Sequence, residues 1–238
     1  MNNKDHFVPR FYLKNWCIDG FLQCSRIDRN PDDLIWKPFA TKGVGYKRGL
    51  YQEQEGIFYK PLDTACSRFV AELLNDRKFE GISQHNIGEE NHELWAKFVL
   101  AQIVRIPEKI DRSTKQYKHV SDELVREAIV KASVNENAVS DLRKMVWVVG
   151  ELKSKYELIT GDNPVIFSPN NLLNPECFVL FPLSPKHFFL ATYPDNIKKF
   201  PSDADEMVKC INRMIYSNSH SRVFARDPSL IVGVIERT

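Results

Sequence analysis

The amino-acid sequence predicts an α+β protein whose 238 residues pack as one mixed domain. Short apolar runs bounded by turn residues occur towards both ends of the chain, and such runs are typical of strands. Between them, apolar residues recur at spacings of three and four, which is the spacing of one helix face. The chain shows neither a repeat nor a low-complexity linker. We therefore expect a helical segment at about 56–155 between N-terminal (5–40) and C-terminal (156–236) β parts.

The N-terminal β part is expected to be a small antiparallel sheet built on a hairpin. Asp19 and Gly20 separate two apolar runs within residues 11–27. An Asp-Gly pair in that position favours a two-residue turn, because both of its residues must adopt positive φ. Residues 34–39 are expected to add a third strand, and the glycines and lysines of 41–49 indicate a loop.

The central segment is expected to form a block of helices. The first begins near Pro61, and the second covers about 89–106 and ends at Pro107, because proline cannot continue a helix. Two more are expected at about 121–133 and 136–153, where apolar residues form one stripe.

In the C-terminal part, helical spacing gives way to short runs of β-branched and aromatic residues, which predict strands. A helix at about 204–217 is expected to precede one or two short strands that end near residue 235. The strands expected before that helix cover 156–160, 165–167, 177–181 and 187–193.

The charge balance is close to neutral. Thirty-three Lys and Arg face 31 Asp and Glu, so an interaction with nucleic acid must rest on a local patch. The five cysteines have no zinc-like spacing and are interpreted as reduced thiols. The polar N-terminus does not resemble a signal peptide, and no segment approaches the roughly 18 apolar residues of a membrane span. These features predict a cytoplasmic protein without a membrane partner, and they leave its oligomeric state unknown.

Missing motifs exclude several classes of enzyme. The chain has no P-loop, no Gly-x-Ser-x-Gly elbow and no His-Glu-x-x-His, which removes P-loop enzymes, α/β-hydrolases and the commonest zinc proteases. The histidines show no paired spacing on a helix or strand. A multi-histidine metal site is therefore not expected.

Residues 98–106 are apolar except for Gln102 and Arg105. Their spacing of three puts both side chains on one face of a helix that is otherwise apolar all round. A buried guanidinium without an anionic partner is strongly unfavourable, so Arg105 is expected to bind an anion. The anion is either an internal Asp or Glu in a structural ion pair, which is the commoner arrangement, or the phosphate or carboxylate of a substrate.

Two further stretches carry candidate site residues. Asp162 and Asn163 follow an apolar strand, and the end of a buried strand is a rigid support for catalytic carboxylates. The same Asp-Asn-Pro sequence is also ordinary turn chemistry. His6 directly precedes the apolar run into the expected hairpin, so it is either a solvated side chain or one carried inward to a site.

Five motifs follow one another along the chain, and they occupy residues 6–16, 26–29, 102–107, 160–165 and 181–185. They read His-Phe-Val-Pro-Arg-Phe-Tyr-Leu-Lys-Asn-Trp, Arg-Ile-Asp-Arg after the Asp-Gly turn, Gln-Ile-Val-Arg-Ile-Pro, Thr-Gly-Asp-Asn-Pro-Val and Phe-Pro-Leu-Ser-Pro. This collinear series resembles that of domain-of-unknown-function family 4238, a widespread and mostly microbial family, over roughly residues 5–225.

The resemblance implies one shared site. Asp63 stands where the family pattern has a glutamate, Ile106 replaces a threonine, and Gly161 replaces a serine. The resemblance brings no established activity. The side chains that it implies to come together are His6, Asp63, Gln102, Arg105, Asp162 and Asn163.

The first functional hypothesis is a nuclease-like hydrolase of the phosphodiester type, whose partner is a nucleic acid or nucleotide. His6 would serve as general acid or base, and Arg105 would hold the phosphate. Asp162 would orient His6 or, with Asp63, hold a Mg²⁺ ion through water, although no cofactor is firmly implied. The residues expected to position the substrate are Gln102, Asn163 and Tyr12.

The second hypothesis is a binding or interaction protein in which the same residues form a buried hydrogen-bond network. The two differ in what surrounds the polar cluster. A pocket reached by solvent and lined by His6, Arg105 and Asp162 favours the enzyme, whereas full burial with every polar atom paired favours the network.

Overall fold

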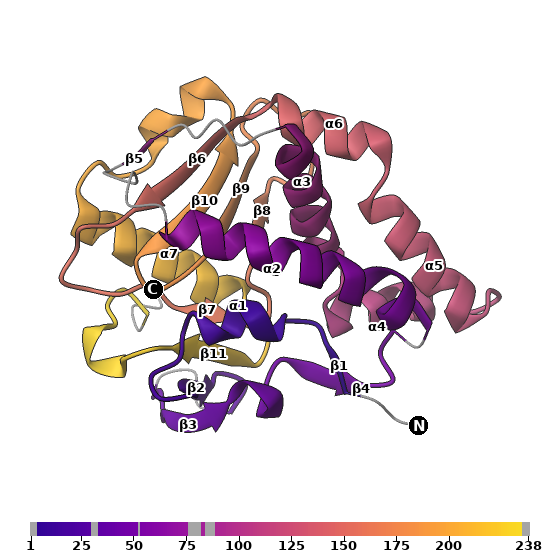
Figure 1. Cartoon of the computed structure of the whole chain (residues 1–238), viewed down its shortest axis with the longest axis horizontal. Coiled ribbons are helices and arrows are strands. Elements are labelled where there is room, and N and C mark those ends of the chain that lie inside the picture. The colour runs from indigo at the N-terminus through magenta and orange to yellow at the C-terminus, as the bar shows by residue number, and fades with distance from the viewer. Residues whose placement is uncertain (1–3, 30–32, 52, 76–81, 84–88, 235–238) are drawn as a thin grey trace.

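The computed structural model describes residues 4–29, 33–51, 53–75, 82–83 and 89–234. Within these residues the chain has the predicted α+β fold, with helices arranged around antiparallel sheets (Figure 1). The helices are α1 (Arg10–Lys14), α2 (Lys60–Asn75), α3 (Glu89–Val104), α4 (Pro107–Gln116), α5 (Asp122–Ser133), α6 (Glu136–Lys144) and α7 (Ala204–Asn218). The strands are β1 (Lys4–His6), β2 (Phe21–Arg26), β3 (Lys37–Ala40), β4 (Tyr46–Arg48), β5 (Ile82–Ser83), β6 (Val146–Glu151), β7 (Thr160–Gly161), β8 (Ile166–Ser168), β9 (Phe178–Pro182), β10 (His187–Thr192) and β11 (Arg222–Ala225).

The largest sheet has the strand order β5-β6-β10-β9-β8. Helix α3 packs against it, because the ring of Trp95 lies 6.0 Å from that of Phe181 on β9 and 5.5 Å from that of Phe189 on β10. Figure 1 shows α3 and α2 beside this sheet. The helix with apolar residues on all sides is therefore a central buried helix, as its composition predicts.

A second sheet, of order β3-β2-β11-β7, combines strands from the two ends of the chain. Tyr12 on α1 ties this sheet to the larger one. Its hydroxyl shares a hydrogen bond of 2.6 Å with the Thr160 hydroxyl on β7 and donates to the Pro182 carbonyl of β9 at 2.7 Å. The remaining sheet is the pair β1-β4, which holds His6 opposite Tyr46.

The Asp19-Gly20 turn is present, but the prediction of a strand before it is wrong. Asp19 has φ 50° and Gly20 has φ 83°, the positive values that this turn requires. Strand β2 follows the turn, whereas α1 precedes it. Tyr12 and Leu13 are adjacent and both buried, which suits a short helix in the core but not the alternation of a half-buried strand.

The prediction of a helix at 136–153 is wrong over the second half of that range. Helix α6 ends at Lys144, and Val146 begins strand β6, which lies between β5 and β10. Its run of valine and tryptophan suits a strand buried on both faces, although the same run continues the apolar spacing of α6. Helix α4 was not expected. It begins at Pro107, because the first helical position needs no backbone donor.

Of the one or two short strands expected after the last helix, β11 is present. Ile231 makes only an isolated bridge with Glu157, and residue 235 lies outside the described residues.

All five cysteines are free thiols, as their spacing predicts. Among the described helices, none combines the length and the apolarity that a membrane crossing requires.

Candidate functional site

Arg105, one residue beyond α3, is fully buried and is bound on two sides. Its Nη1 donates to Asp63 Oδ1 on α2 at 2.8 Å, and its Nε donates to the Phe7 carbonyl oxygen at 3.0 Å. Its guanidinium carbon lies 5.5 Å from the centre of the Tyr59 ring. The sequence left open whether Arg105 binds an internal carboxylate or a substrate anion. In the structure it binds the internal carboxylate of Asp63.

Gln102 reaches the same carbonyl as Arg105. Its Nε2 donates to the Phe7 oxygen at 2.7 Å, so one carbonyl accepts a hydrogen bond from each of the two polar residues of the apolar helix. This contact confirms that the spacing of three places both side chains on one face. Gln102 Oε1 and Arg105 Nη2 are buried and have no hydrogen-bond partner among the described residues.

Asp63 also faces a pocket of about 570 Å³, which we call the charged pocket. Residues from β1, α1 and α2 line it together with the π-helical turn Glu55–Tyr59 that leads into α2. Turns of this kind occur frequently at functional sites. The charged or titratable residues that line it are Lys4, Asp5, His6, Arg10, Glu55, Lys60 and Asp63.

Glu55 has a pKa suited to proton transfer near neutral pH. The pKa of Glu55 is raised to about 7, mainly by burial and also by the charges of Asp5 and Asp63, against the opposing effect of Arg105. Glu55 Oε2 is buried without a hydrogen-bond partner among the described residues. A carboxyl group in this state can give or take a proton at pH 7.

His6 is carried inward, as one of its two interpretations requires. Burial lowers the pKa of His6 to about 4, and the positive charge of Arg10 contributes to the same shift. The imidazole is therefore neutral at pH 7 and able to accept a proton. Its Nε2 is buried and, within the described part of the chain, has no hydrogen-bond partner.

Asp5 connects the charged pocket to the buried arginine through Tyr51. The Tyr51 amide donates to Asp5 Oδ2 at 3.0 Å, and the Tyr51 hydroxyl donates to the Arg105 carbonyl oxygen. The rings of Tyr51 and Tyr59 lie 4.3 Å apart between centres. Burial raises the pKa of both phenols above its ordinary value, so both are protonated at neutral pH.

Asp162 belongs to a different cluster. Its carboxylate accepts hydrogen bonds from the amides of His220, Ser221 and Arg222 at 2.8–3.0 Å, and from the Ser221 hydroxyl at 2.7 Å. Among the described residues, no hydrogen bond or ion pair joins Asp162 to His6. The described part of the structure therefore shows no contact through which Asp162 orients His6, because its carboxylate accepts hydrogen bonds from residues 220–222. The expectation that Asp162 holds a metal ion with Asp63 stays a prediction.

Asn163 and Tyr12 are also structural here. Asn163 and Asn218 exchange hydrogen bonds, because each side-chain amide donates to the other residue's carbonyl oxygen at 3.1 and 2.9 Å. Tyr12 bridges two sheets and does not line the charged pocket. The single gathering that the resemblance implied is thus divided between two places.

Sequence reasoning missed Asp5, Glu55 and the two buried tyrosines, although the sequence contained a signal for three of them. Tyr51, Glu55, Tyr59 and Asp63 recur every four residues, which is the spacing of one helix face. Tyrosine and carboxylate side chains on such a face predict a polar cluster. Asp5 is the exception, since it gives no such periodic signal.

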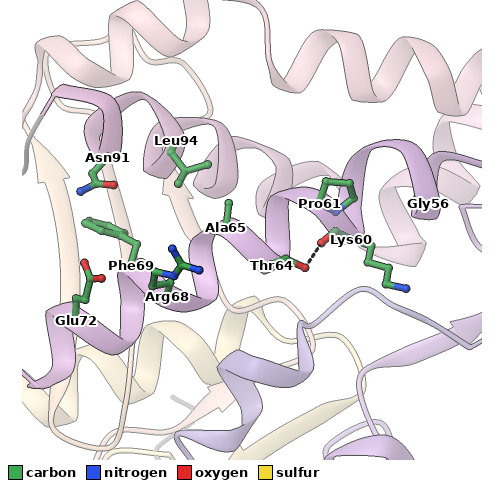
Figure 2. A pocket seen from close by; sticks show the side chains of 10 residues that line it. All are labelled: Gly56, Lys60, Pro61, Thr64, Ala65, Arg68, Phe69, Glu72, Asn91 and Leu94. Carbon is green, nitrogen blue, oxygen red and sulfur yellow. Dashed lines mark hydrogen bonds between the residues drawn. The ribbon is translucent and has the colours of Figure 1, made fainter.

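A second pocket, which we call the helix pocket, adjoins the charged pocket. It has a volume of about 860 Å³, and Lys60 and Thr64 line both pockets. Figure 2 shows Arg68 and Phe69 on α2 with Asn91 on α3 around it.

The part of the chain that the structure describes has no arranged set of metal ligands. In the described ranges, no three His, Cys, Asp or Glu side chains are grouped so that they could hold a metal ion. Two of the three acids of the charged pocket are instead engaged separately, Asp5 with the Tyr51 amide and Asp63 with Arg105.

The fold and the polar cluster define an α+β protein with a charged pocket beside a buried ion pair. A family model described as "Protein of unknown function (DUF4238)" matches residues 4–229. The chain therefore belongs to this family, which confirms the resemblance of the motif series. No curated protein and no solved structure matches the chain.

Proposed function

We propose that the chain is a nuclease-like hydrolase of the phosphodiester type that acts in the charged pocket. One observation carries this proposal. Of the eight buried polar side-chain atoms without a hydrogen-bond partner among the described residues, two belong to His6 and Glu55, which line the charged pocket. Two more belong to Gln102 and Arg105, which do not line it but contact the Phe7 carbonyl oxygen next to His6 in the chain. A buried polar group without a partner costs about 1–3 kcal/mol, so such a concentration favours a site completed by a ligand or by water.

The rim of the charged pocket supports a phosphate-bearing substrate. Lys4, Arg10 and Lys60 line it, and the side chains of Arg10 and Lys60 have no hydrogen bond or ion pair with another described residue. Free cations around a concave site attract anions and stabilise the charge that develops during phosphoryl transfer. We assign phosphate binding to these residues and not to Arg105, because the Arg105 guanidinium is enclosed and does not line the pocket.

Two groups are suited to opposite proton transfers. Neutral His6 can accept the proton of the attacking water or hydroxyl, and protonated Glu55 can donate a proton to the leaving oxygen. Their environments move the two pKa values apart, which is the usual basis for assigning base and acid. Asp63 and Arg105 act as positioning residues, since their ion pair fixes α2 against the end of α3.

The second hypothesis, a buried network without catalysis, describes part of the molecule. It accounts for Asp162, Asn163 and Tyr12, whose hydrogen bonds are all made within the protein. It does not account for the unpaired atoms of His6 and Glu55 beside a pocket. The hydrolase is therefore the proposal that the geometry supports best.

The test is hydrolysis of bis-p-nitrophenyl phosphate, RNA, DNA and cyclic nucleotides, with and without Mg²⁺. Glu55→Gln should lower the rate by about 100-fold or more, the usual contribution of a general acid. Glu53→Gln is the matched control, because Glu53 is exposed and does not line the charged pocket. A wild-type protein inactive on every substrate, or equal rates for the two variants, contradicts the proposal.

A further inference from the structure

A second group of cations lies on one face of the sheet β3-β2-β11-β7. Residues paired directly across antiparallel strands project to the same face, and the register places Lys37 opposite Cys24 and Arg222 opposite Arg26. Phe39 follows Lys37 by two residues, so it shares that face. One end of the sheet therefore brings cationic side chains from three strands together with an aromatic ring.

A pocket of about 360 Å³, which we call the sheet pocket, is sunk into this face. Its volume lies in the range of small-molecule sites, about 300–1,000 Å³. The cations that line it are Arg26, Arg29, Lys37 and Arg222, and Ile35 and Phe39 supply apolar surface.

Most of this positive charge is not paired with a carboxylate of the described residues. Arg26 forms an ion pair with Asp28. The side chains of Arg29, Lys37 and Arg222, in contrast, have no hydrogen bond or ion pair with any other described residue. Asp33 adds one carboxylate to the lining, so the pocket keeps an excess of positive charge that suits an anion.

The apolar side chains of the sheet pocket are exposed. Phe39 has 38% of its surface open to solvent and Ile35 has 52%. An exposed ring beside unpaired cations matches a ligand that carries both a flat ring and a phosphate. Nucleotides have this combination of groups.

We propose that the sheet pocket binds a nucleotide unit, with its base stacked on Phe39 and its phosphate held by Arg29, Lys37 and Arg222. The unit is either a free nucleotide or one residue of a single strand. A duplex does not fit the proposal, because its bases are stacked on one another and present no free face. The sheet pocket also supplies the local patch that the small net charge of +2 requires of any nucleic-acid interaction.

Binding is measured by fluorescence anisotropy of a labelled single-stranded RNA octamer, and by calorimetry with AMP. All proteins carry Glu55→Gln, so that hydrolysis in the charged pocket does not consume the probe. Phe39→Ala should weaken binding about tenfold, the usual effect of removing one stacking platform. Lys37→Ala should weaken octamer binding and lower its salt dependence by about 0.7 in the logarithmic slope.

Two variants serve as matched controls. Phe21→Ala removes an exposed ring from the other face of the same sheet, and Lys198→Ala removes an exposed cation elsewhere. Both should bind like the parent. Phe39→Leu keeps apolar bulk without a ring, so it separates loss of stacking from loss of folding, which thermal melting also monitors.

Losses for Phe39→Ala and Lys37→Ala with both probes support a free-nucleotide site, and losses with the octamer alone support a single-strand site. The proposal is overturned if neither probe binds, if the controls weaken binding equally, or if polyglutamate of the same charge competes as well as RNA. Binding without cleavage by wild-type protein would refute the proposed hydrolase and leave the sheet pocket standing, because the two proposals rest on different residues.

Discussion

Arg105 and Asp63 form an ion pair whose two members have different surroundings. The guanidinium is fully enclosed, while 21% of the Asp63 side chain remains exposed at the charged pocket, and the N···O distance is 2.8 Å. A charge in the core is thereby joined to a group that a ligand can reach. Any ligand that changes the charge of Asp63 would act on the packing of α2 against the end of α3.

The pair should respond asymmetrically to the loss of each partner. Asp63→Asn leaves a buried guanidinium that cannot lose its proton, so it should destabilise the fold by about 3 kcal/mol. Arg105→Met should cost less, because Asp63 can take up a proton and burial already raises its pKa. Urea unfolding of the two variants measures both free energies.

The exposed pair Lys47–Asp111 is the matched control, because its N···O distance is also 2.8 Å and both side chains are nearly half exposed. Lys47→Met should change the free energy of unfolding by less than about 1 kcal/mol. If Arg105→Met proves more costly than Asp63→Asn, the asymmetry assigned to the buried pair is wrong.

Asp162 should behave as a structural residue. Asp162→Asn replaces an acceptor of four hydrogen bonds by a neutral amide with one oxygen, which should destabilise the protein by about 2–3 kcal/mol. Hydrolysis by the folded fraction should be unchanged. Asp227→Asn is the control, since Asp227 accepts from a serine amide and hydroxyl at the surface. A selective loss of turnover in Asp162→Asn would return this residue to the catalytic site.

The sequence predicts the fold class well because its apolar spacing changes along the chain. It fails where two structures share one spacing, as at Val146–Glu151, where β6 continues the apolar stripe of α6. It also fails for α1, because an Asp-Gly turn fixes the geometry of the turn but not the structure that precedes it. Only tertiary packing decides these segments.

The candidate site was predictable in part. The unusual position of Arg105 in an apolar helix indicates a buried anion, and the structure supplies Asp63. The division between the Asp162 cluster and the charged pocket could not be predicted, because a collinear motif series does not say which motifs meet in space. The raised pKa of Glu55 is likewise a property of its buried surroundings and not of its local sequence.

Glu55 should make the protein less stable as the pH rises. Burial raises its pKa from 4.5 to about 7, so between these values the folded chain keeps a proton that the unfolded chain releases. The contribution of Glu55 to stability is therefore present below pH 4.5 and is lost as the pH rises through about 7. Glu55→Gln should show a smaller fall in Tm between pH 5 and pH 8 than wild type or Glu53→Gln. Parallel Tm curves for all three proteins would contradict this.

His6 should have the opposite effect on the acid side. Its pKa is lowered from 6.5 to about 4, so the unfolded chain binds a proton in this range that the folded chain does not. The contribution of His6 is fully present above pH 6.5 and is lost as the pH falls through about 4. Thermal melts of His6→Gln should lose less Tm between pH 6.5 and pH 4 than wild type. His119→Gln, which changes an exposed histidine, should follow wild type.

The proposed hydrolase should have a pH profile set by the same two groups. His6 must be neutral and Glu55 protonated, so kcat/KM should hold between about pH 4 and pH 7 and fall about tenfold per unit above that. Glu55→Gln should lower kcat/KM throughout and remove the decline above pH 7, because the group that titrates there is gone. Initial rates on bis-p-nitrophenyl phosphate from pH 4.5 to pH 9 measure this. An alkaline decline that persists in Glu55→Gln would mean that another residue donates the proton.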